Sequence, residues 1–205
     1  MTPSDPESVA VAGALNLFDE SRLRLADAEA LRELRDDLLR ASFLRGQVHL
    51  DSGVDQPYFF DKYLIASRPG ILRRLSRFLA RNVPAGTDRV AAPTLGAVAI
   101  GTAVSLETGL PLAIVRTQSQ DGNRGRLVEG GLHPGETVAL IEDVVVTGSR
   151  ALQAAGRLRA AGAEVTAVLA TIDCERGADA ALSAEGLQYL PLFRYSAFSE
   201  SGKTA

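Results

Sequence analysis

The sequence predicts an α/β fold: a doubly wound, mostly parallel sheet with helices on both faces and a small amino-terminal hood. Short apolar segments alternate with helical ones along most of the chain, which is typical of βαβ units. The length of 205 residues, with 46% hydrophobic and 23% charged residues, is that of an ordinary globular domain. We therefore expect ligands at the carboxyl ends of the strands, where doubly wound sheets bind them.

The first elements are expected to form the hood. Residues 27–43 predict an amphipathic helix whose leucines share one face and whose acids share the other. Short strands around Val48 and Tyr58 flank an Asp-Ser-Gly turn at residues 51–53 and predict a hairpin.

The core is expected to start with a helix capped by Ser67, with Pro69 in its first turn and an apolar stripe behind it. Alternating elements follow. The expected strands are residues 89–92, 112–115, 138–141 and 165–172. The expected helices are residues 98–108, 150–161 and 178–185.

These elements predict a single domain over residues 1–205, without an internal linker. Its expected parts are an extension (1–26), the hood (27–66), the core (67–193) and a tail (194–205).

Composition excludes several functional classes. A net charge of -3 and a pI near 5.5 give no electrostatic reason to expect nucleic acid as a partner. The one cysteine, Cys174, excludes an intramolecular disulfide and a cysteine-built zinc site, and fits a reducing cytoplasm. The small apolar stretch 9–15 lacks the basic flank of a signal peptide, and no apolar run is long enough to span a bilayer. We expect a cytoplasmic protein without a membrane partner.

The most informative segment is residues 138–150, VALIEDVVVTGSR. Its apolar start predicts a buried strand that delivers Glu142 and Asp143 to the carboxyl end of the sheet. Since neighbouring strand residues point to opposite sides, one acid can face a ligand while the other orients the ligand or a metal. Both carboxylates can accept hydrogen bonds from a sugar diol.

The turn that follows suits a phosphate monoester. Thr147 and Ser149 supply hydroxyls, and Gly148 allows close approach of the backbone. The next helix begins with unpaired N–H groups and a positive dipole end. The alternative is a strand, an N-cap and a helix of any doubly wound protein, with the acids merely solvated.

This arrangement resembles the phosphoribosyl pyrophosphate (PRPP) motif of type I phosphoribosyltransferases, in which two acids, two apolar residues and a Thr-Gly turn follow a strand. Residues 47–64, QVHLDSGVDQPYFFDKYL, with Ser-Arg-Pro at 67–69, resemble the amino-terminal hood segment of orotate phosphoribosyltransferases. Residues 91–101, 116–130 and the stretch through Asp173 resemble the same family in the same order.

The resemblance implies transfer of a 5-phosphoribosyl group from PRPP to orotate with release of pyrophosphate, in pyrimidine nucleotide biosynthesis. It implies Mg²⁺ supplied as Mg-PRPP, with no metal held directly by the protein, and a homodimer. In this reading Glu142 and Asp143 hold the ribose hydroxyls and Arg116 clamps the pyrophosphate. Leu95 and Gly96 lie in the pyrophosphate-side loop. The 5′-phosphate residues are Val144, Val145, Val146, Thr147, Gly148, Ser149 and Arg150, and the base-binding residues are Phe59, Phe60, Val146 and Cys174.

Several of these residues could have a structural role instead of a role in ligand binding. Gly96 could serve a tight turn before a helix, Arg150 could point outward, and Phe59 and Phe60 could be core aromatics. The polar stretch 116–130 is either a lid that excludes water during catalysis or disorder. We interpret Arg124 and Arg126 as solubilising charges, and His49 and His133 as structural or solvent-facing.

The chain departs from the family in the lid and at the base. Thr117, Gln120 and Gly122 stand where orotate enzymes carry two lysines and a histidine, and Asp51 stands where the hood carries a lysine. At the base, Val146 and Cys174 replace a Thr and an Arg. Two alternatives therefore stay open: a PRPP- or nucleotide-binding regulatory protein without the chemistry, and a phosphoribosyltransferase for another base.

Overall fold

A six-stranded sheet forms the centre of the protein in a computed structural model that describes residues 25–49, 55–93, 95–117 and 126–199. Its order is β5-β4-β3-β6-β7-β8, and every pair is parallel except β4 and β5. The strands are β3 (Arg89–Ala92), β4 (Leu112–Val115), β5 (Val128–Glu129), β6 (Thr137–Val145), β7 (Glu164–Asp173) and β8 (Gln188–Arg194).

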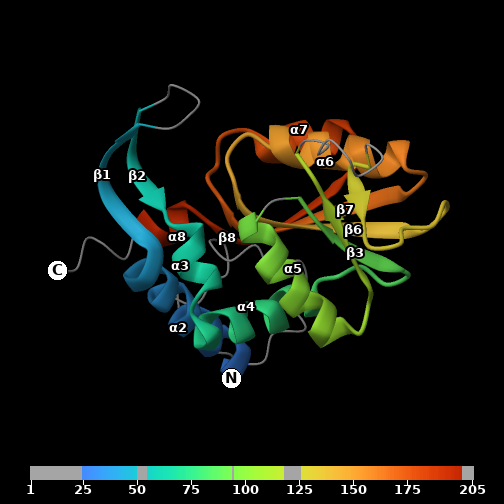
Figure 1. Cartoon of the computed structure of the whole chain (residues 1–205). Coiled ribbons are helices and arrows are strands. Elements are labelled where there is room, and N and C mark those ends of the chain that lie inside the picture. The colour runs from blue at the N-terminus through green and yellow to red at the C-terminus, as the bar shows by residue number, and fades with distance from the viewer. Residues whose placement is uncertain (1–24, 50–54, 94, 118–125, 200–205) are drawn as a thin grey trace, which may run out of the picture.

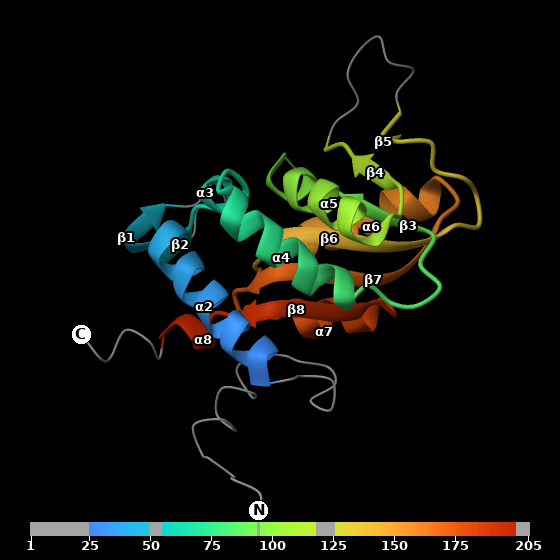
Figure 2. The same cartoon turned by 90° about the horizontal axis from the view of Figure 1, so that it is seen from below.

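Helices cover both faces of this sheet, as Figures 1 and 2 show. One face carries α4 (Pro69–Arg81) and α5 (Leu95–Thr108), and the other carries α6 (Ser149–Ala160) and α7 (Ala178–Ala184). Alternation along β6 explains the two layers. Ala139 and Ile141 belong to the hydrophobic cluster on the α4 and α5 side, whereas Val138 and Leu140 belong to the cluster on the α6 side. The predicted doubly wound α/β fold is confirmed.

The chain reverses its winding direction between β3 and β6. From β3 it passes through α5 to β4 on one side, and from β6 it passes through α6 to β7 on the other. Since β3 and β6 are adjacent and parallel, with Val90 opposite Ala139, the two connections separate at their carboxyl ends. In open α/β sheets this switch point is where ligands bind.

The hood lies beside that edge of the sheet (Figure 1). It consists of α2 (Leu25–Ser42), the antiparallel pair β1 (Phe43–His49) and β2 (Asp55–Phe60), and the short helix α3 (Lys62–Ala66). The helix and hairpin predicted from the sequence are present. The turn 51–53 and the side chains of residues 45–49 and 55–58 lie outside the described part of the structure.

The prediction that Ser67 caps the next helix is wrong. Ser67 is the C-cap residue of α3, and Arg68 is the N-cap residue of α4, with Pro69 in the first turn as expected. The helix α3 was not predicted, because its five residues are too few to show a helical period. It is nucleated locally by Asp61, whose carboxylate accepts the backbone N–H groups of Tyr63 and Leu64 at 3.0 and 3.1 Å.

Three further elements differ from expectation. β6 continues four residues past Ile141, because β7 supplies hydrogen-bonding partners as far as Asp173. β8 was not predicted, since Pro191 interrupts its pattern; proline is tolerated there because β8 is an edge strand. Part of the expected tail forms α8 (Ser196–Ser199), whose Phe198 is fully buried. No helix in the described part of the chain is long and apolar enough to cross a membrane.

Candidate active site

The two acids of the central motif lie within β6, close to its carboxyl end. Glu142 and Asp143 are only 4% and 3% exposed. Glu142 follows the alternation of Val138 and Leu140 toward the α6 side, and Asp143 points toward the α5 side. The pair therefore straddles the sheet at the point where its two layers of helices separate.

The environment of Glu142 disfavours its charge. Burial, and then the negative charge of Asp143, raise the pKa of Glu142 to about 8, while the charges of Lys62 and Arg150 act in the opposite direction. Among the described residues, no hydrogen-bond donor reaches Glu142 Oε1. A buried carboxyl group with an unpartnered oxygen is ready to accept a donor or a cation from a ligand.

Asp143 lies against the first turn of α5. Its Oδ1 accepts the N–H of Val144 at 2.7 Å, whereas its buried Oδ2 receives no hydrogen bond from the described residues. The Nζ of Lys62 lies 3.4 Å from Oδ2. An added Cβ on Gly96 would overlap this oxygen, so Gly96 is required for the close approach of the carboxylate to α5.

Lys62 was missed as a site residue by sequence reasoning. It is the first residue of α3 and reaches the acids from the hood, eighty-one positions earlier in the chain than Asp143. No spacing rule links the two positions. The only signal was a lysine beside the aromatic pair Phe59 and Phe60 in the hood segment.

The turn after β6 has the geometry expected of a phosphate cradle. Gly148 has a φ of 81° and is buried, and α6 begins at the next residue. An added Cβ there would lie 3.4 Å from Leu182 and adopt a backbone conformation that favours glycine. Thr147 and Ser149 are exposed, and the Thr147 hydroxyl donates to Ser149 Oγ at 3.1 Å. Arg150 is exposed, yet its charge is near enough to act on Glu142.

The segment predicted to be a lid is anchored at both of its described ends. The N–H of Arg116 donates to the carbonyl of Leu127 at 2.8 Å, and the Arg116 guanidinium lies 3.6 Å from Glu129. Arg157 of α6 donates to the carbonyls of Arg116 and Thr117 at 2.7 and 2.9 Å. Gln120, Gly122 and Arg124 lie outside the described residues. Arg116 thus stands at the sheet edge, but it is paired with an acid in this structure.

The expected base-binding residues are largely buried. Phe60 belongs to the main hydrophobic cluster, with its ring centroid 5.1 Å from that of Phe43 and 5.0 Å from that of Phe198. This packing favours a structural role for Phe60, whereas Phe59 is half-buried. Val146 is half-buried, and Cys174 is 4% exposed with its N–H bonded to the carbonyl of Val145 at 2.8 Å. Contact of any of them with a base stays a prediction.

The remaining pyrophosphate-side residues frame the start of α5. Leu95 is 75% exposed and Gly96 is buried, while Thr94 before them is not described.

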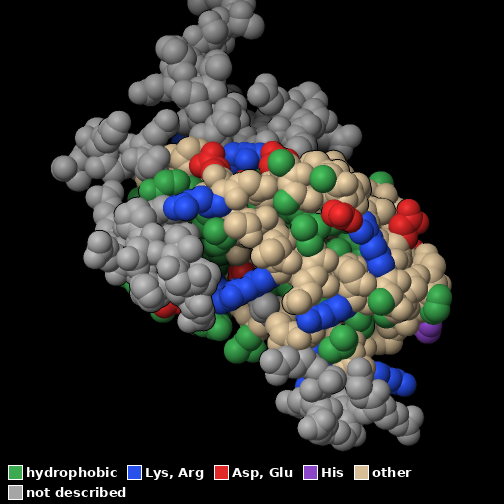
Figure 3. Space-filling view, turned by 90° about the horizontal axis from the view of Figure 1, so that it is seen from above, with side chains coloured by type: hydrophobic (Ala, Val, Ile, Leu, Met, Phe, Trp, Pro, Cys, Tyr) green, Lys and Arg blue, Asp and Glu red, His purple; other side chains and the backbone are tan. Residues whose placement is uncertain are grey.

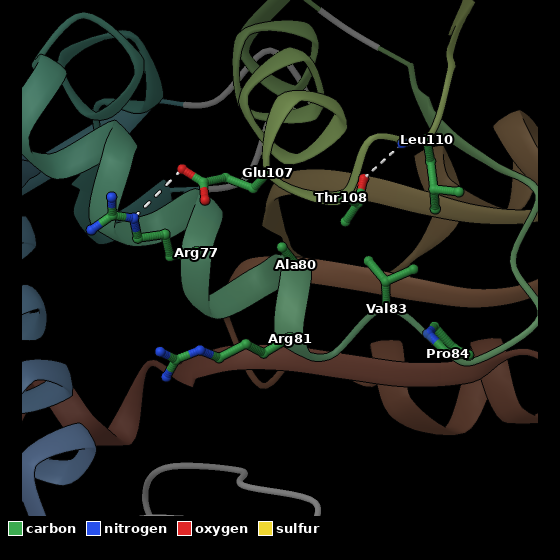
Figure 4. Close-up of a pocket in the computed structure, with 8 residues that line it drawn as sticks. All are labelled: Arg77, Ala80, Arg81, Val83, Pro84, Glu107, Thr108 and Leu110. Atoms are coloured by element: carbon green, nitrogen blue, oxygen red, sulfur yellow. Dashed lines mark hydrogen bonds and ion pairs between the residues drawn. The ribbon is translucent and has the colours of Figure 1, made fainter.

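In the space-filling view an acidic side chain shows at the bottom of a recess, and basic side chains lie beside it (Figure 3). A pocket away from the acids lies between the carboxyl-terminal parts of α4 and α5, where Arg77 pairs with Glu107 (Figure 4).

A doubly wound sheet with a buried acid pair and a glycine turn at its switch point has the architecture of a type I phosphoribosyltransferase. Orotate phosphoribosyltransferase of Thermococcus gammatolerans is 36% identical over 180 residues, covering 86% of this chain and 95% of the relative. The chain belongs to the orotate phosphoribosyltransferase family. This confirms the family predicted from the sequence motifs.

Solved structures agree with this assignment. Mycobacterium tuberculosis orotate phosphoribosyltransferase in complex with Fe(III) dicitrate gives a TM-score of 0.73 at 28% identity, covering 82% of this chain and 98% of that one. The same enzyme in complex with PRPP gives a TM-score of 0.67 at 28% identity, with coverages of 83% and 99%. No protein-family model matches the chain.

Proposed function

We propose that this chain transfers the 5-phosphoribosyl group of PRPP to a ring nitrogen of orotate, with release of pyrophosphate, in pyrimidine nucleotide biosynthesis. The observation that carries the proposal is the position of Glu142 and Asp143. They lie buried between the first turn of α5 and the glycine turn before α6, and one oxygen of each receives no hydrogen bond from the described residues. Membership of the orotate phosphoribosyltransferase family supports the same activity.

The chemistry is an exchange at one carbon of the ribose. The bond from the anomeric carbon to the pyrophosphate oxygen breaks, a bond to the base nitrogen forms, and the nitrogen loses its proton. Because positive charge develops on the sugar, catalysis needs positioning and electrostatic stabilisation more than a nucleophile. Glu142 and Asp143 accept hydrogen bonds from the ribose hydroxyls and place negative charge beside the sugar. The segment 144–150 holds the 5′-phosphate.

Arg116 is the proposed partner of the pyrophosphate. Its guanidinium can bind phosphate oxygens in a bidentate manner once it leaves Glu129, which lies 3.6 Å away across the two ends of the loop. This exchange of partners would couple PRPP binding to the opening of the ion pair between Arg116 and Glu129.

Magnesium would arrive as Mg-PRPP and neutralise part of the charge of the pyrophosphate. The oxygens of Glu142 and Asp143 that receive no hydrogen bond from the described residues fit a hard cation, which prefers oxygen ligands. No group of three or more His, Cys, Asp or Glu side chains is placed to hold a metal ion within the described residues. We propose that oxygens of PRPP supply further ligands to the magnesium ion.

The family resemblance also supports a homodimer, and the single buried Cys174 is compatible with a cytoplasmic location. We keep the division into extension, hood, core and tail as part of the proposal, with the boundary of the tail moved beyond α8. Its Phe198 is fully buried, and its ring contacts those of Phe60 and Phe193.

A second candidate is a phosphoribosyltransferase for a less polar base. The apolar character of Val146 and the burial of Cys174 favour it, because neither side chain offers the bidentate partner that a carboxylate of orotate would bind. Loss of a charge-assisted hydrogen bond costs about 1.5 to 3 kcal/mol of affinity. A PRPP-binding protein without turnover is the third candidate, favoured by the pairing of Arg116 with Glu129.

One experiment separates the three candidates. The purified protein is incubated with Mg-PRPP and orotate, uracil or purines, and loss of base and release of pyrophosphate are followed. Product with orotate alone supports the proposed function, and product with another base alone supports the second candidate. Tight PRPP binding in calorimetry without turnover supports the third.

Variants then test the receptor itself. Asp143→Asn should abolish most PRPP binding, because it removes the charge at the acid pair. Glu107→Gln, an acid near the other end of α5, should bind PRPP as the wild type does. Equal affinity for the wild type and Asp143→Asn would contradict the proposed site.

A further inference from the structure

The only lysines in the sequence are Lys62 and Lys203, although arginine is frequent. Lys62 is thus an exception in a chain that uses arginine for nearly all its positive charge. An ammonium is a compact charge on a flexible stem, whereas a guanidinium is planar and larger. At position 62 the chain thus places the more compact of the two cations at a crowded position beside buried acids.

Lys62 is directed into the site by local structure. Asp61 caps α3 with two backbone hydrogen bonds and so fixes the direction in which the first residue of the helix projects. The Cδ of Lys62 would lie 3.1 Å from a Cβ built on Gly96, and its Nζ is 3.4 Å from Asp143 Oδ2. The side chain therefore crosses the first turn of α5 on its way to the acids.

In this position the ammonium neutralises an acid that is otherwise poorly compensated. Asp143 is 4% exposed at its side chain, and Lys62 is 22% exposed. The contact is an ion pair without a hydrogen bond, since no described donor reaches Asp143 Oδ2 within bonding geometry. Such a contact is easily exchanged, because little directional bonding is lost when the lysine moves.

We propose that Lys62 is a PRPP-binding residue, which pairs with Asp143 in the free protein and turns to the pyrophosphate of PRPP when the ribose occupies the acid pair. The inference rests on the proposed function. Ribose hydroxyls that donate hydrogen bonds to Asp143 take the place of the ammonium and release it. The pyrophosphate then offers it several negative charges beside α5, whose amino-terminal N–H groups also favour an anion.

This role fits the composition of the rest of the site. The loop that starts at Arg116 has Thr at 117, Gln at 120 and Gly at 122, so it brings no lysine to the pyrophosphate. Leu95, which is exposed at the start of α5, brings no charge either. Lys62 supplies from the hood a cation that these positions do not.

Calorimetry with three probes tests the proposal: Mg-PRPP, Mg-pyrophosphate and ribose 5-phosphate, which lacks the pyrophosphate. Lys62→Met should lose about 10- to 100-fold in affinity for the first two probes, as expected for a charge-assisted hydrogen bond. Its affinity for ribose 5-phosphate should stay within about twofold. Lys62→Arg should restore part of the loss, because it keeps the charge on a larger group.

The matched control is Arg77→Met. It removes the same charge from an exposed side chain paired with Glu107, which lies about 16 Å along α5 from Gly96. All three affinities should equal those of the wild type. Thermal melting of every variant establishes that the folded protein is being compared.

Other results would contradict either the role of Lys62 or the proposed function. Unchanged or tighter PRPP binding by Lys62→Met would show that the lysine only neutralises Asp143. An equal loss for all three probes would show that it acts by shaping the site. If the wild type binds Mg-pyrophosphate through Lys62 but does not bind Mg-PRPP, the proposed function is wrong and the anion site at Lys62 is supported. If the wild type binds none of the probes, both fail.

Discussion

Glu142 is placed where an ionised carboxylate is least stable. Burial and the charge of Asp143 raise its pKa to about 8, so the free protein holds a proton there at neutral pH. A ligand that brings hydroxyl donors or a cation favours the charged form and releases the proton. Without its ligand, the folded protein is thus less stable than it would be with an uncharged side chain at position 142. Such a loss of stability is common at functional sites.

We predict that Glu142→Gln makes the free protein more stable at alkaline pH. The folded-state pKa is raised above the ordinary 4.5, so the stabilising contribution of the protonated group is fully present below about pH 4.5 and is lost as the pH rises through about 8. Glutamine does not titrate. The free energy of unfolding of the variant relative to the wild type should rise by on the order of 4 kcal/mol between pH 4.5 and pH 8.5.

Urea denaturation at both pH values measures this difference. Glu107→Gln serves as the control, because it makes the same substitution at a partly exposed side chain near the other end of α5. A constant stability difference between wild type and Glu142→Gln across this range would mean that Glu142 is already ionised in the free protein.

Gly96 permits the closest approach in the site. An added methyl group there would overlap Asp143 Oδ2 and crowd Lys62 Cδ at 3.1 Å. Gly96→Ala should therefore displace the carboxylate and lower the affinity for Mg-PRPP about 10- to 100-fold, equivalent to about 1.4 to 2.7 kcal/mol. Calorimetry measures the loss. Gly70→Ala, where nothing lies within 4 Å of the added Cβ, is the matched control and should bind normally.

At the scale of elements, α6 joins the two halves of the site. It begins at the glycine turn, and its Arg157 holds the carbonyls of Arg116 and Thr117 at the end of β4. The proposed phosphate site and the proposed pyrophosphate clamp are thereby attached to one rigid helix.

Arg157→Met should remove the attachment of Arg116 to α6. Because the two charge-assisted bonds position the backbone of Arg116, their loss should lower kcat/KM for PRPP about 10-fold or more while leaving the fold intact. Steady-state kinetics at varied PRPP measures the effect. Arg159→Met breaks an equivalent bond from α6 to the carbonyl of Glu185 and should leave the kinetics unchanged. Equal effects of the two variants would refute the positioning role.

The alternating core elements could be predicted from the sequence, because β3, β4 and β7 are apolar runs and α4 has a clear buried stripe. Elements whose formation depends on tertiary contacts or on a single cap could not be predicted in this way. The extension of β6 depends on pairing with β7, and α3 depends on a single capping aspartate.

The same division holds for the site. Glu142, Asp143 and Gly148 lie within one continuous motif, and residue types and spacing alone indicate their chemistry. Lys62 and Arg157 act on residues far from them in the sequence, and Phe60 is drawn into the core by Phe198 from the carboxyl end. A pattern read along the chain does not contain those contacts.

For the whole molecule, the hood and the sheet share one hydrophobic core. A single cluster includes buried side chains of α2, β2 and α3 together with those of the sheet and α8. Phe198 contacts both parts: its ring centroid lies 5.0 Å from that of Phe60 in the hood and 5.8 Å from that of Phe193 in β8. The position of Lys62 over the acid pair depends on this packing.

We predict that Phe198→Ala destabilises the protein as one cooperative unit. Loss of a fully buried phenylalanine costs about 3 to 5 kcal/mol of unfolding free energy, and the shared core should preserve a single urea transition with an unchanged slope. Leu106→Ala, at a side chain 81% exposed, should change stability by less than about 0.5 kcal/mol. Two separate transitions in Phe198→Ala would mean that the hood folds independently, and PRPP affinity would then fall with the first of them, because the hood carries Lys62.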